Sequence, residues 1–250
     1  MITIKSRAEI DKMRAAGRVV ARAIRTMGEA IVPGKTTTLE LDQIGARVVA
    51  EAGGKCSFYQ YRGYPAHVCI SVNEQVIHGI PGPRVLQEGD VVDLDIGVFL
   101  DGYHADASWS YPVGEVSTEA KRLLNVTRES LFQGIAKAKL GNRIGDIGHA
   151  VQKYVESNGY SVVRDLVGHG IGQNLHEDPS VPNYGRPNSG IPLREGMTFC
   201  IEPMVNVGTF KVHTLEDDWT IVTADGKWSA HFEHTIAVTK AGPEILTLED

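Results

Sequence analysis

The chain has 250 residues, of which 42% are hydrophobic and 22% charged, and its formal net charge at pH 7 is −6. This composition is typical of a globular protein that is long enough to bury a sizeable core. A negative chain without a basic block argues against a protein that binds nucleic acid through its phosphates. Neither a signal-peptide core nor an apolar run of transmembrane length is found, so we expect no membrane segment. Three scattered cysteines without a CxxC pair favour a reducing, cytoplasmic location.

The N-terminal part predicts two helices. Ser6 and Glu9 form a capping box ahead of apolar residues at helical spacing, which predicts a first helix up to about residue 31. A second helix is expected from about Thr38 through Val49, ending at a Gly-Gly pair.

An aromatic-rich loop follows over residues 56–68. It contains Phe58, Tyr61 and Tyr64, and such a loop forms either a lid over a pocket or a hydrophobic plug. Cys69 then begins a short predicted strand, 69–73. His78 lies just before glycine and proline turns, where a side chain can point into a cleft.

Residues 91–106 predict a β-hairpin. Apolar residues alternate along its first half, and Asp101-Gly102 is a strong two-residue turn signal. Counting back from this turn pairs Gly97 with Asp106, so Asp95 and Asp106 lie diagonally on one face, roughly 7–8 Å apart. Two carboxylates in this position repel each other unless a cation lies between them, and a metal ion is the simplest candidate.

An internal repeat extends the acidic pair to four carboxylates. Residues 86–96 match residues 193–203, so Asp95 corresponds to Glu202 and Asp106 to Glu233. Helices expected from Ser117 to Gly141 and from residue 144 to 157 repeat the order of the first half. We therefore predict an α+β fold, with helices on one face of a curved antiparallel sheet. The halves, roughly residues 1–115 and 116–250, would form one domain with pseudo-twofold symmetry.

The second half also supplies histidines. His169 lies among three glycines, which leave its imidazole unobstructed as a metal ligand or base, and His176 is a second candidate. Residues 177–192 are rich in Pro, Asn and Gly and predict a loop. A strand over 198–207, an excursion over 208–228 with Trp219, and a last strand with Glu233 complete the chain. Five other histidines are assigned to structural or surface positions: His67, His149, His213, His231 and His234.

The chemistry of this set is that of a metallohydrolase. Four carboxylates carry too much negative charge for one divalent ion, so two bridged ions balance it better. Oxygen-rich sites with one imidazole suit Mn, Fe or Co, and Zn remains an option. A bridging water would be acidified to a hydroxide nucleophile, with a carboxylate to accept its proton and histidines to stabilise an oxyanion. Asp93 and His104 share the acidic face, so either could be a ligand, although we expect them to support the ligands or to be solvated.

The ordered set resembles the type I methionine aminopeptidases, which have the pita-bread fold of the M24 metallopeptidases. The matching stretches cover nearly the whole chain and include Gly63-Tyr-Pro, His78-Gly-Ile-Pro, Asp93-Leu-Asp-Ile-Gly, Gly168-His-Gly-Ile-Gly and Glu233-His-Thr. One departure is Leu175, where an aromatic residue is common in that family.

The resemblance implies a methionyl aminopeptidase that removes the initiator Met from nascent proteins when the next residue is small. It implies two divalent ions (Co, Mn, Fe or Zn), with Asp95 on one ion, Asp106 and Glu233 bridging, and His169 with Glu202 on the other. Glu202 would also handle the proton of the nucleophilic water, His176 would steady the tetrahedral intermediate, and His78 would contact the substrate. The S1 pocket would consist of Phe58, Tyr61, Tyr64, Cys69 and Trp219. A cytoplasmic monomer that touches the ribosome transiently is expected.

Three other interpretations stay open at this stage. An X-Pro aminopeptidase or prolidase-like enzyme shares the five ligands but usually carries a large extra N-terminal domain. A catalytically inactive pita-bread binding module would be expected to have lost ligands, and none is missing here. A two-metal enzyme that transfers phosphate would need Arg or Lys near the acids, and the nearest, Arg194, lies at a strand entry.

Overall fold

The computed structural model describes residues 1–249, and its helices begin where the sequence predicts them. Ser6 accepts the N–H of Glu9 at 3.4 Å, and the Glu9 carboxylate accepts the Ser6 N–H at 2.7 Å, which completes the predicted capping box. Thr37 and Glu40 form a second such box. The helices are α1 (Arg7–Glu29), α2 (Thr38–Glu51), α3 (Thr118–Ile135) and α4 (Ile144–Ser157), with one turn of 3-10 helix, η1 (Tyr61–Gly63).

A large, mainly antiparallel sheet forms the centre of the molecule, with strand order β1-β4-β5-β13-β9-β7-β8. Strands β2, β6, β10 and β14 pair at its flanks, and a small second sheet has the order β11-β12-β3. The strands are β1 (Lys55–Cys56), β2 (Cys69–Val72), β3 (Gln75–Ile77), β4 (Val91–Leu100), β5 (Tyr103–Pro112), β6 (Ser161–Val162), β7 (Gly168–Gly170), β8 (Glu177–Val181), β9 (Thr198–Ile201), β10 (Met204–Asn206), β11 (Val212–Thr214), β12 (Ile221–Thr223), β13 (Ser229–Thr239) and β14 (Gly242–Ile245).

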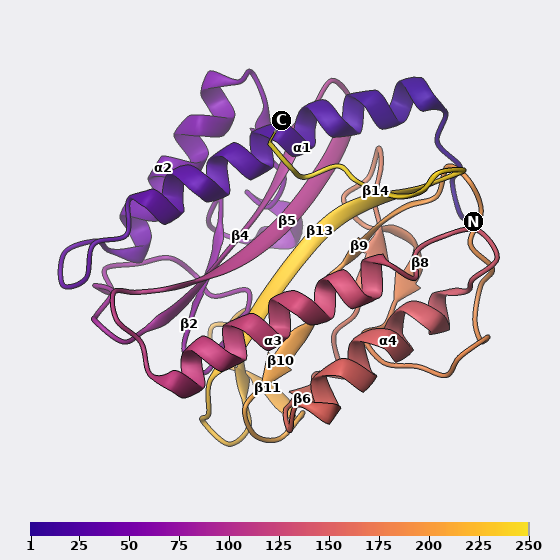
Figure 1. Ribbon diagram of the computed structural model, residues 1–250. Helices are drawn as coiled ribbons and strands as arrows, with labels where there is room; N and C mark the ends of the chain where they lie inside the picture. The colour runs from indigo at the N-terminus through magenta and orange to yellow at the C-terminus, as the bar shows by residue number, and fades with distance from the viewer. Residues whose placement is uncertain (250) are drawn as a thin grey trace.

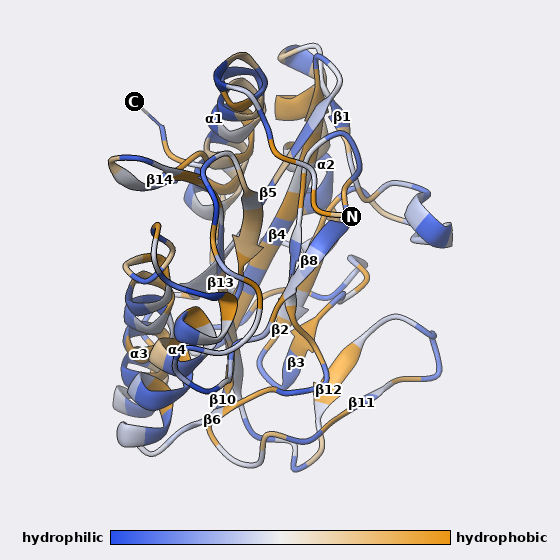
Figure 2. Ribbon diagram, turned by 90° about the vertical axis from the view of Figure 1, so that its right-hand side faces the viewer, coloured by the Kyte–Doolittle hydropathy of each residue, from blue (hydrophilic) through white to orange (hydrophobic). Residues whose placement is uncertain are grey.

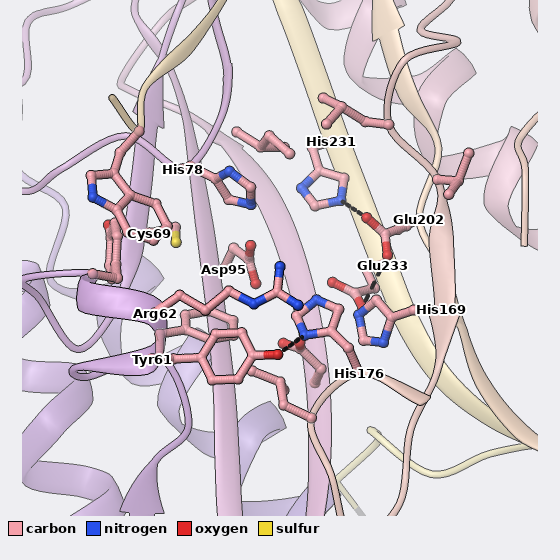
Figure 3. A pocket seen from close by; sticks show the side chains of 18 residues that line it. Tyr61, Arg62, Cys69, His78, Asp95, His169, His176, Glu202, His231 and Glu233 are labelled. Atoms are coloured by element: carbon pink, nitrogen blue, oxygen red, sulfur yellow. Dashed lines mark hydrogen bonds and ion pairs between the residues drawn. The ribbon is translucent and has the colours of Figure 1, made fainter. Parts of the chain in front are cut away.

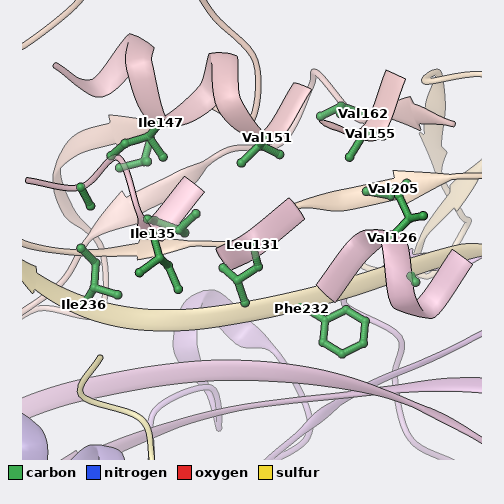
Figure 4. Packing of buried hydrophobic residues seen from close by; sticks show 14 of the residues in the cluster. Val126, Leu131, Ile135, Ile147, Val151, Val155, Val162, Val205, Phe232 and Ile236 are labelled. Atoms are coloured by element: carbon green, nitrogen blue, oxygen red, sulfur yellow. The ribbon is translucent and has the colours of Figure 1, made fainter. Parts of the chain in front are cut away.

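The helices cover one face of this sheet, as predicted. α1 packs against β4 and β5, and α3 packs against β13, so each half of the chain contributes helices and the strands beneath them (Figure 1). The view turned by 90° shows α1, α3 and α4 on one side of the strands, with β11 and β12 on the other (Figure 2). Apolar side chains of α3 and α4, among them Leu131 and Ile147, fill the space above β13 (Figure 4). Trp109 of β5 packs against this cluster and also against the cluster beneath α1.

The central hairpin has the predicted register. Gly97 pairs with Asp106 and Leu100 with Tyr103, so the two-residue turn determines the alignment of β4 and β5. The alternating apolar residues Val92, Leu94, Ile96 and Val98 are all fully buried against the helices.

Three element boundaries differ from the prediction. α3 ends at Ile135 and not at Gly141, because the N–H groups of residues 137 and 138 bond to carbonyl oxygens three residues earlier and no longer four. Ala138 is nevertheless buried in the core. The predicted loop 177–192 begins with strand β8, whose Pro179 is tolerated because β8 lies at the edge of the sheet. The predicted strand 198–207 is interrupted at Pro203, which lacks an N–H, and divides into β9 and β10.

The excursion over 208–228 is also more ordered than predicted. Its strands β11 and β12 pair with each other, and β12 pairs with β3 through Ile221 and Ile77. This pairing brings Trp219, just before β12, close to His78, just after β3; their ring centroids are 6.4 Å apart.

Candidate active site

Three of the four carboxylates lie on neighbouring strands of the sheet, and the fourth, Glu202, directly follows the next strand, β9. Asp95 of β4 and Glu233 of β13 both pair with Ser108 of β5, one from each side. Asp106 lies two residues before Ser108, so its side chain is on the same face. The register of β9 and β10 with β13 is the same before and after Pro203, which places Glu202 opposite Glu233. The predicted convergence of both acidic pairs is therefore present.

Burial dominates the electrostatics of this cluster. The exposed fractions of the four residues lie between 3% and 8%. Desolvation raises the pKa of Asp106 to about 7, and it raises the pKa values of Asp95, Glu202 and Glu233 well above their ordinary range, with further contributions from neighbouring acids. A cation between these carboxylates would relieve both the desolvation and the mutual repulsion.

Several oxygens of the cluster fit the role of metal ligands. Asp95 Oδ1, Asp106 Oδ1 and Glu233 Oε1 are buried without a hydrogen-bond partner among the described residues. Ligand atoms of these three side chains lie within 4.8 Å of one another, and a second group of this kind contains His169, Cys200 and Glu233. Buried polar atoms normally have partners, so partnerless oxygens that face one another fit a cation-binding site.

Glycines place His169 beside the acids. A Cβ atom at Gly168 would lie 2.4 Å from the carbonyl oxygen of Cys200, and one at Gly170 would lie 2.2 Å from that of Asp178. Only glycine allows β7 to approach both neighbours this closely. His169 Nδ1 lies 2.9 Å from the carbonyl oxygen of Gly170, which leaves Nε2 facing Glu202 Oε1 at 3.7 Å.

A cavity of about 240 Å³ opens above the acids (Figure 3). The five residues predicted to form the S1 pocket all line it: Phe58, Tyr61, Tyr64, Cys69 and Trp219. Leu175 also lines it and is 2% exposed. The aromatic loop therefore forms a wall of this cavity. It borders a pocket and is not a hydrophobic plug. One side of the cavity is apolar and the opposite side carries the carboxylates.

Two further predicted histidines line the cavity. Desolvation lowers the pKa of His78 to about 4 and that of His176 to about 3, and the nearby charge of His169 contributes at His176. Both imidazoles are therefore neutral at pH 7. His176 Nδ1 lies 2.9 Å from the hydroxyl of Tyr61, an interaction that connects the aromatic loop to the histidine side.

The sequence analysis missed two polar residues that line the cavity. His231 was assigned to a structural or surface position, but it is 1% exposed, lines the cavity and lies 4.0 Å from Glu202 through Nε2. The repeat could have revealed it, since His231 lies two residues before Glu233 and shares its face. Arg62 was not singled out at all, and it lines the mouth of the cavity.

Other polar residues on these strands support the acids or lie elsewhere. Asp93 is buried and accepts hydrogen bonds from Ser108 at 2.6 Å and Ser110 at 3.1 Å, so it supports the site and is not solvated. His104 contacts Ser57 through Nδ1 at 2.8 Å and does not line the cavity. Cys200 is fully buried beside Glu233.

Comparison with known proteins agrees with this geometry. The sequence model that describes metallopeptidase family M24 matches residues 11–240 of the chain. The chain belongs to metallopeptidase family M24. A methionine aminopeptidase from Clostridium perfringens is 53% identical over 248 residues, which cover 99% of both chains. The crystal structure of a methionine aminopeptidase from Thermotoga maritima superposes with a TM-score of 0.98 at 48% identity and covers 100% of both chains. A prolidase from Pyrococcus horikoshii shares the fold with a TM-score of 0.80 at 24% identity, and 64% of its chain is covered.

These findings confirm the family and the fold class predicted from sequence. The M24 chain is a metallopeptidase with the helix-covered antiparallel sheet of the pita-bread fold, and the family uses divalent metal ions. Among residues 1–249, no helix has both the length and the apolar character needed to cross a membrane.

Proposed function

We propose that this M24 metallopeptidase is a methionine aminopeptidase that releases the initiator Met from nascent chains and peptides whose second residue is small. The observation that carries the proposal is the cluster of buried, partnerless carboxylate oxygens at the polar side of a cavity whose other side is aromatic. The methionine aminopeptidase from Clostridium perfringens, which is 53% identical over 99% of this chain, supports it.

We assign five residues to two divalent ions (Co, Mn, Fe or Zn). Asp95 would hold one ion, Asp106 and Glu233 would bridge, and His169 with Glu202 would hold the other. The charges favour two ions, because four carboxylates leave one divalent ion with an excess of two negative charges. The partnerless oxygens and the free Nε2 of His169 are the donor types that these metals accept. When bound, such ions polarise the scissile carbonyl and acidify an attacking water.

Three side chains near the ions have separate roles in the reaction. The Glu202 carboxylate accepts the proton of the attacking water and returns it to the nitrogen of the leaving amine, which requires a carboxylate close to both. His78 and His176 are neutral because burial lowers their pKa values, so each can donate a hydrogen bond to a substrate oxygen without adding positive charge beside the ions. His176 is held in place by Tyr61.

The aromatic side of the cavity would bind the Met side chain. Phe58, Tyr64 and Cys69 are between 2% and 9% exposed, and they form an apolar wall with Tyr61 and Trp219. Aromatic rings and sulfur atoms make favourable contacts with a thioether. In this proposal the 250 residues form a single catalytic domain with two halves, roughly 1–115 and 116–250. The protein acts as a cytoplasmic monomer and contacts the ribosome transiently.

The test is release of free Met by metal-stripped protein to which Mn or Co is added back. We expect turnover of Met-Ala-Ser and Met-Gly-Ser, no turnover of Met-Phe-Ser or Met-Lys-Ser, and no release without metal. Glu202→Gln should abolish release, whereas the exposed control Glu195→Gln should leave it unchanged. Cleavage of an X-Pro peptide and not of Met-Ala-Ser would point to a prolidase-like enzyme. Metal binding without any turnover would point to a binding module.

A further inference from the structure

The mouth of the cavity carries one strong cation that the proposed chemistry does not use. Among the described residues that line the cavity, Arg62 is the only Lys or Arg, and it is exposed. Its guanidinium makes no hydrogen bond or ion pair with the described residues 1–249, and it lies 5.4 Å from the centre of the Tyr61 ring. Figure 3 shows its side chain passing over Tyr61 toward His176. Arg62 is therefore available to a charged group that enters or leaves the cavity.

The backbone at this position does not explain an arginine. Tyr61 to Tyr64 form a tight turn closed by the N–H of Tyr64 on the carbonyl oxygen of Tyr61 at 3.0 Å. Arg62 has φ 51° and Gly63 has φ 91°, and such left-handed pairs favour Asn or Asp followed by Gly. A long, branched cation here costs conformational energy, and residues retained in such positions cluster at functional sites.

Nor does the acidic cluster neutralise this charge. No carboxylate of Asp95, Asp106, Glu202 or Glu233 lies within ion-pairing distance of Arg62. Once metal ions balance these four acids, the guanidinium remains the main charge at the mouth. A planar guanidinium binds carboxylates through two parallel hydrogen bonds, which a single ammonium cannot reproduce.

The path of the substrate leads past Arg62. If the Met side chain lies against Phe58 and Trp219 and the scissile bond lies at the acids, the rest of the peptide must leave through the mouth. An extended chain advances about 3.3–3.6 Å per residue, so the third and fourth substrate residues come within reach of an arginine side chain at the rim.

We propose that Arg62 selects substrates by charge, favouring Asp or Glu at the third or fourth residue of a Met-small peptide and disfavouring Lys or Arg there. The inference rests on the proposed aminopeptidase function and names the substrate class that the site prefers. Because Arg62 touches the substrate outside the scissile bond, it would act on kcat/KM through KM and leave the chemical step unchanged.

The experiment compares three amidated peptides, Met-Ala-Glu-Ser, Met-Ala-Gln-Ser and Met-Ala-Lys-Ser, in the metal-loaded protein. We expect kcat/KM to fall in that order, with about a tenfold difference between the Glu and Lys peptides, because one exposed attraction is exchanged for one exposed repulsion. About 0.3 M salt should reduce this difference, since exposed charges are screened. Arg62→Asn suits the turn better than arginine, so it should fold normally and lose the Glu-to-Lys difference, with its own rate on the Gln peptide as the reference. The control Arg22→Gln, on the exposed side of α1, should keep it.

Several results would overturn the inference. These are equal rates for the three peptides in the parent protein, an unchanged Glu-to-Lys difference in Arg62→Asn, or a parallel loss of rate on all three peptides. The last result would mean that Arg62 supports Tyr61 and His176 and does not contact the substrate. Failure of the parent protein to release Met from the neutral Gln peptide would instead refute the proposed function, and the two failures are thus distinguishable.

Discussion

A buried ion pair near the active site allows a quantitative test of the fold. Lys5 Nζ lies 2.5 Å from Glu177 Oε2, and the two side chains are only 2% and 9% exposed. The other Glu177 oxygen accepts the N–H of Asn174 at 3.1 Å, and the Lys5 N–H donates to the carbonyl oxygen of Gly196 at 2.8 Å. Glu177 directly follows His176, so this pair attaches the N-terminal segment to the strand that follows the histidine.

Removing one partner leaves a buried charge without compensation. We expect Lys5→Met to lower the free energy of unfolding by about 3–5 kcal/mol, the cost typical of a broken buried pair. For a chain of this length each kcal/mol shifts Tm by about 2–4 °C, so Tm should fall by roughly 6–20 °C. The double variant Lys5→Met with Glu177→Gln should recover most of the loss, because Gln can still accept the Asn174 N–H and no buried charge remains.

The assay is urea unfolding of metal-stripped protein, analysed as a double-mutant cycle. The matched control is Lys240→Met, since Lys240 pairs with Glu195 at 3.8 Å on the surface, where the side chains are 82% and 54% exposed. That change should stay within about 0.5 kcal/mol. A cost below about 1 kcal/mol for Lys5→Met, or a double variant as unstable as the sum of the singles, would refute the reasoning.

Three further predictions concern other parts of the molecule. Burial raises the pKa of Asp106 to about 7, so the folded metal-free protein holds protons more tightly than the unfolded chain, and its Tm should fall as the pH rises from 5.5 to 8. Added Mn should abolish most of this fall in Tm, and a Tm that does not change with pH in the absence of metal would contradict the prediction. Burial also raises the pKa values of the Cys69 and Cys200 thiols well above their usual range, so both should react with a disulfide reagent at pH 8 only after unfolding, and rapid labelling of the native protein would be inconsistent with the structure. Gly17→Ala should destabilise the protein by about 1–3 kcal/mol, because its Cβ would lie 2.0 Å from a backbone carbonyl oxygen, whereas Gly82→Ala has open space and should be nearly neutral in the same thermal melt.

The parts of the fold that could be predicted are those encoded locally. The turn at Asp101-Gly102 determines the pairing of β4 with β5, and the alternation on β4 determines which face is buried, so the diagonal placement of Asp95 and Asp106 follows from sequence. The capping box at Ser6 locates the start of α1 in the same way.

The errors arise where distant segments decide the structure. Strand β8 forms because β7 offers an unpaired edge, which the Pro-rich sequence after His176 does not reveal. The repeat aligned Glu202 with Asp95 correctly, but the register differs: the acids of the first half lie diagonally, and those of the second lie opposite each other. A shift of two residues keeps the side chains on one face, so the convergence survived the difference.

The two polar lining residues, His231 and Arg62, were missed for different reasons. His231 is positioned by Asp93, whose Oδ2 lies 3.3 Å from its Nδ1. The registers of β4 and of β13 with β5 together place these two residues on either side of Ser110. Arg62 depends on a left-handed turn that its own residue type disfavours, so propensity argued against any special position for it.

The central claim is that four buried carboxylates and His169 hold two catalytic ions. The most direct test is a titration of metal-stripped protein with Mn that follows bound metal by equilibrium dialysis and Met release from Met-Ala-Ser in the same samples. The account predicts that release rises with metal and that binding saturates at two ions per chain, falling to one or none in Glu233→Gln. Saturation at a single ion with full activity, or two ions still bound by Glu233→Gln, would contradict it.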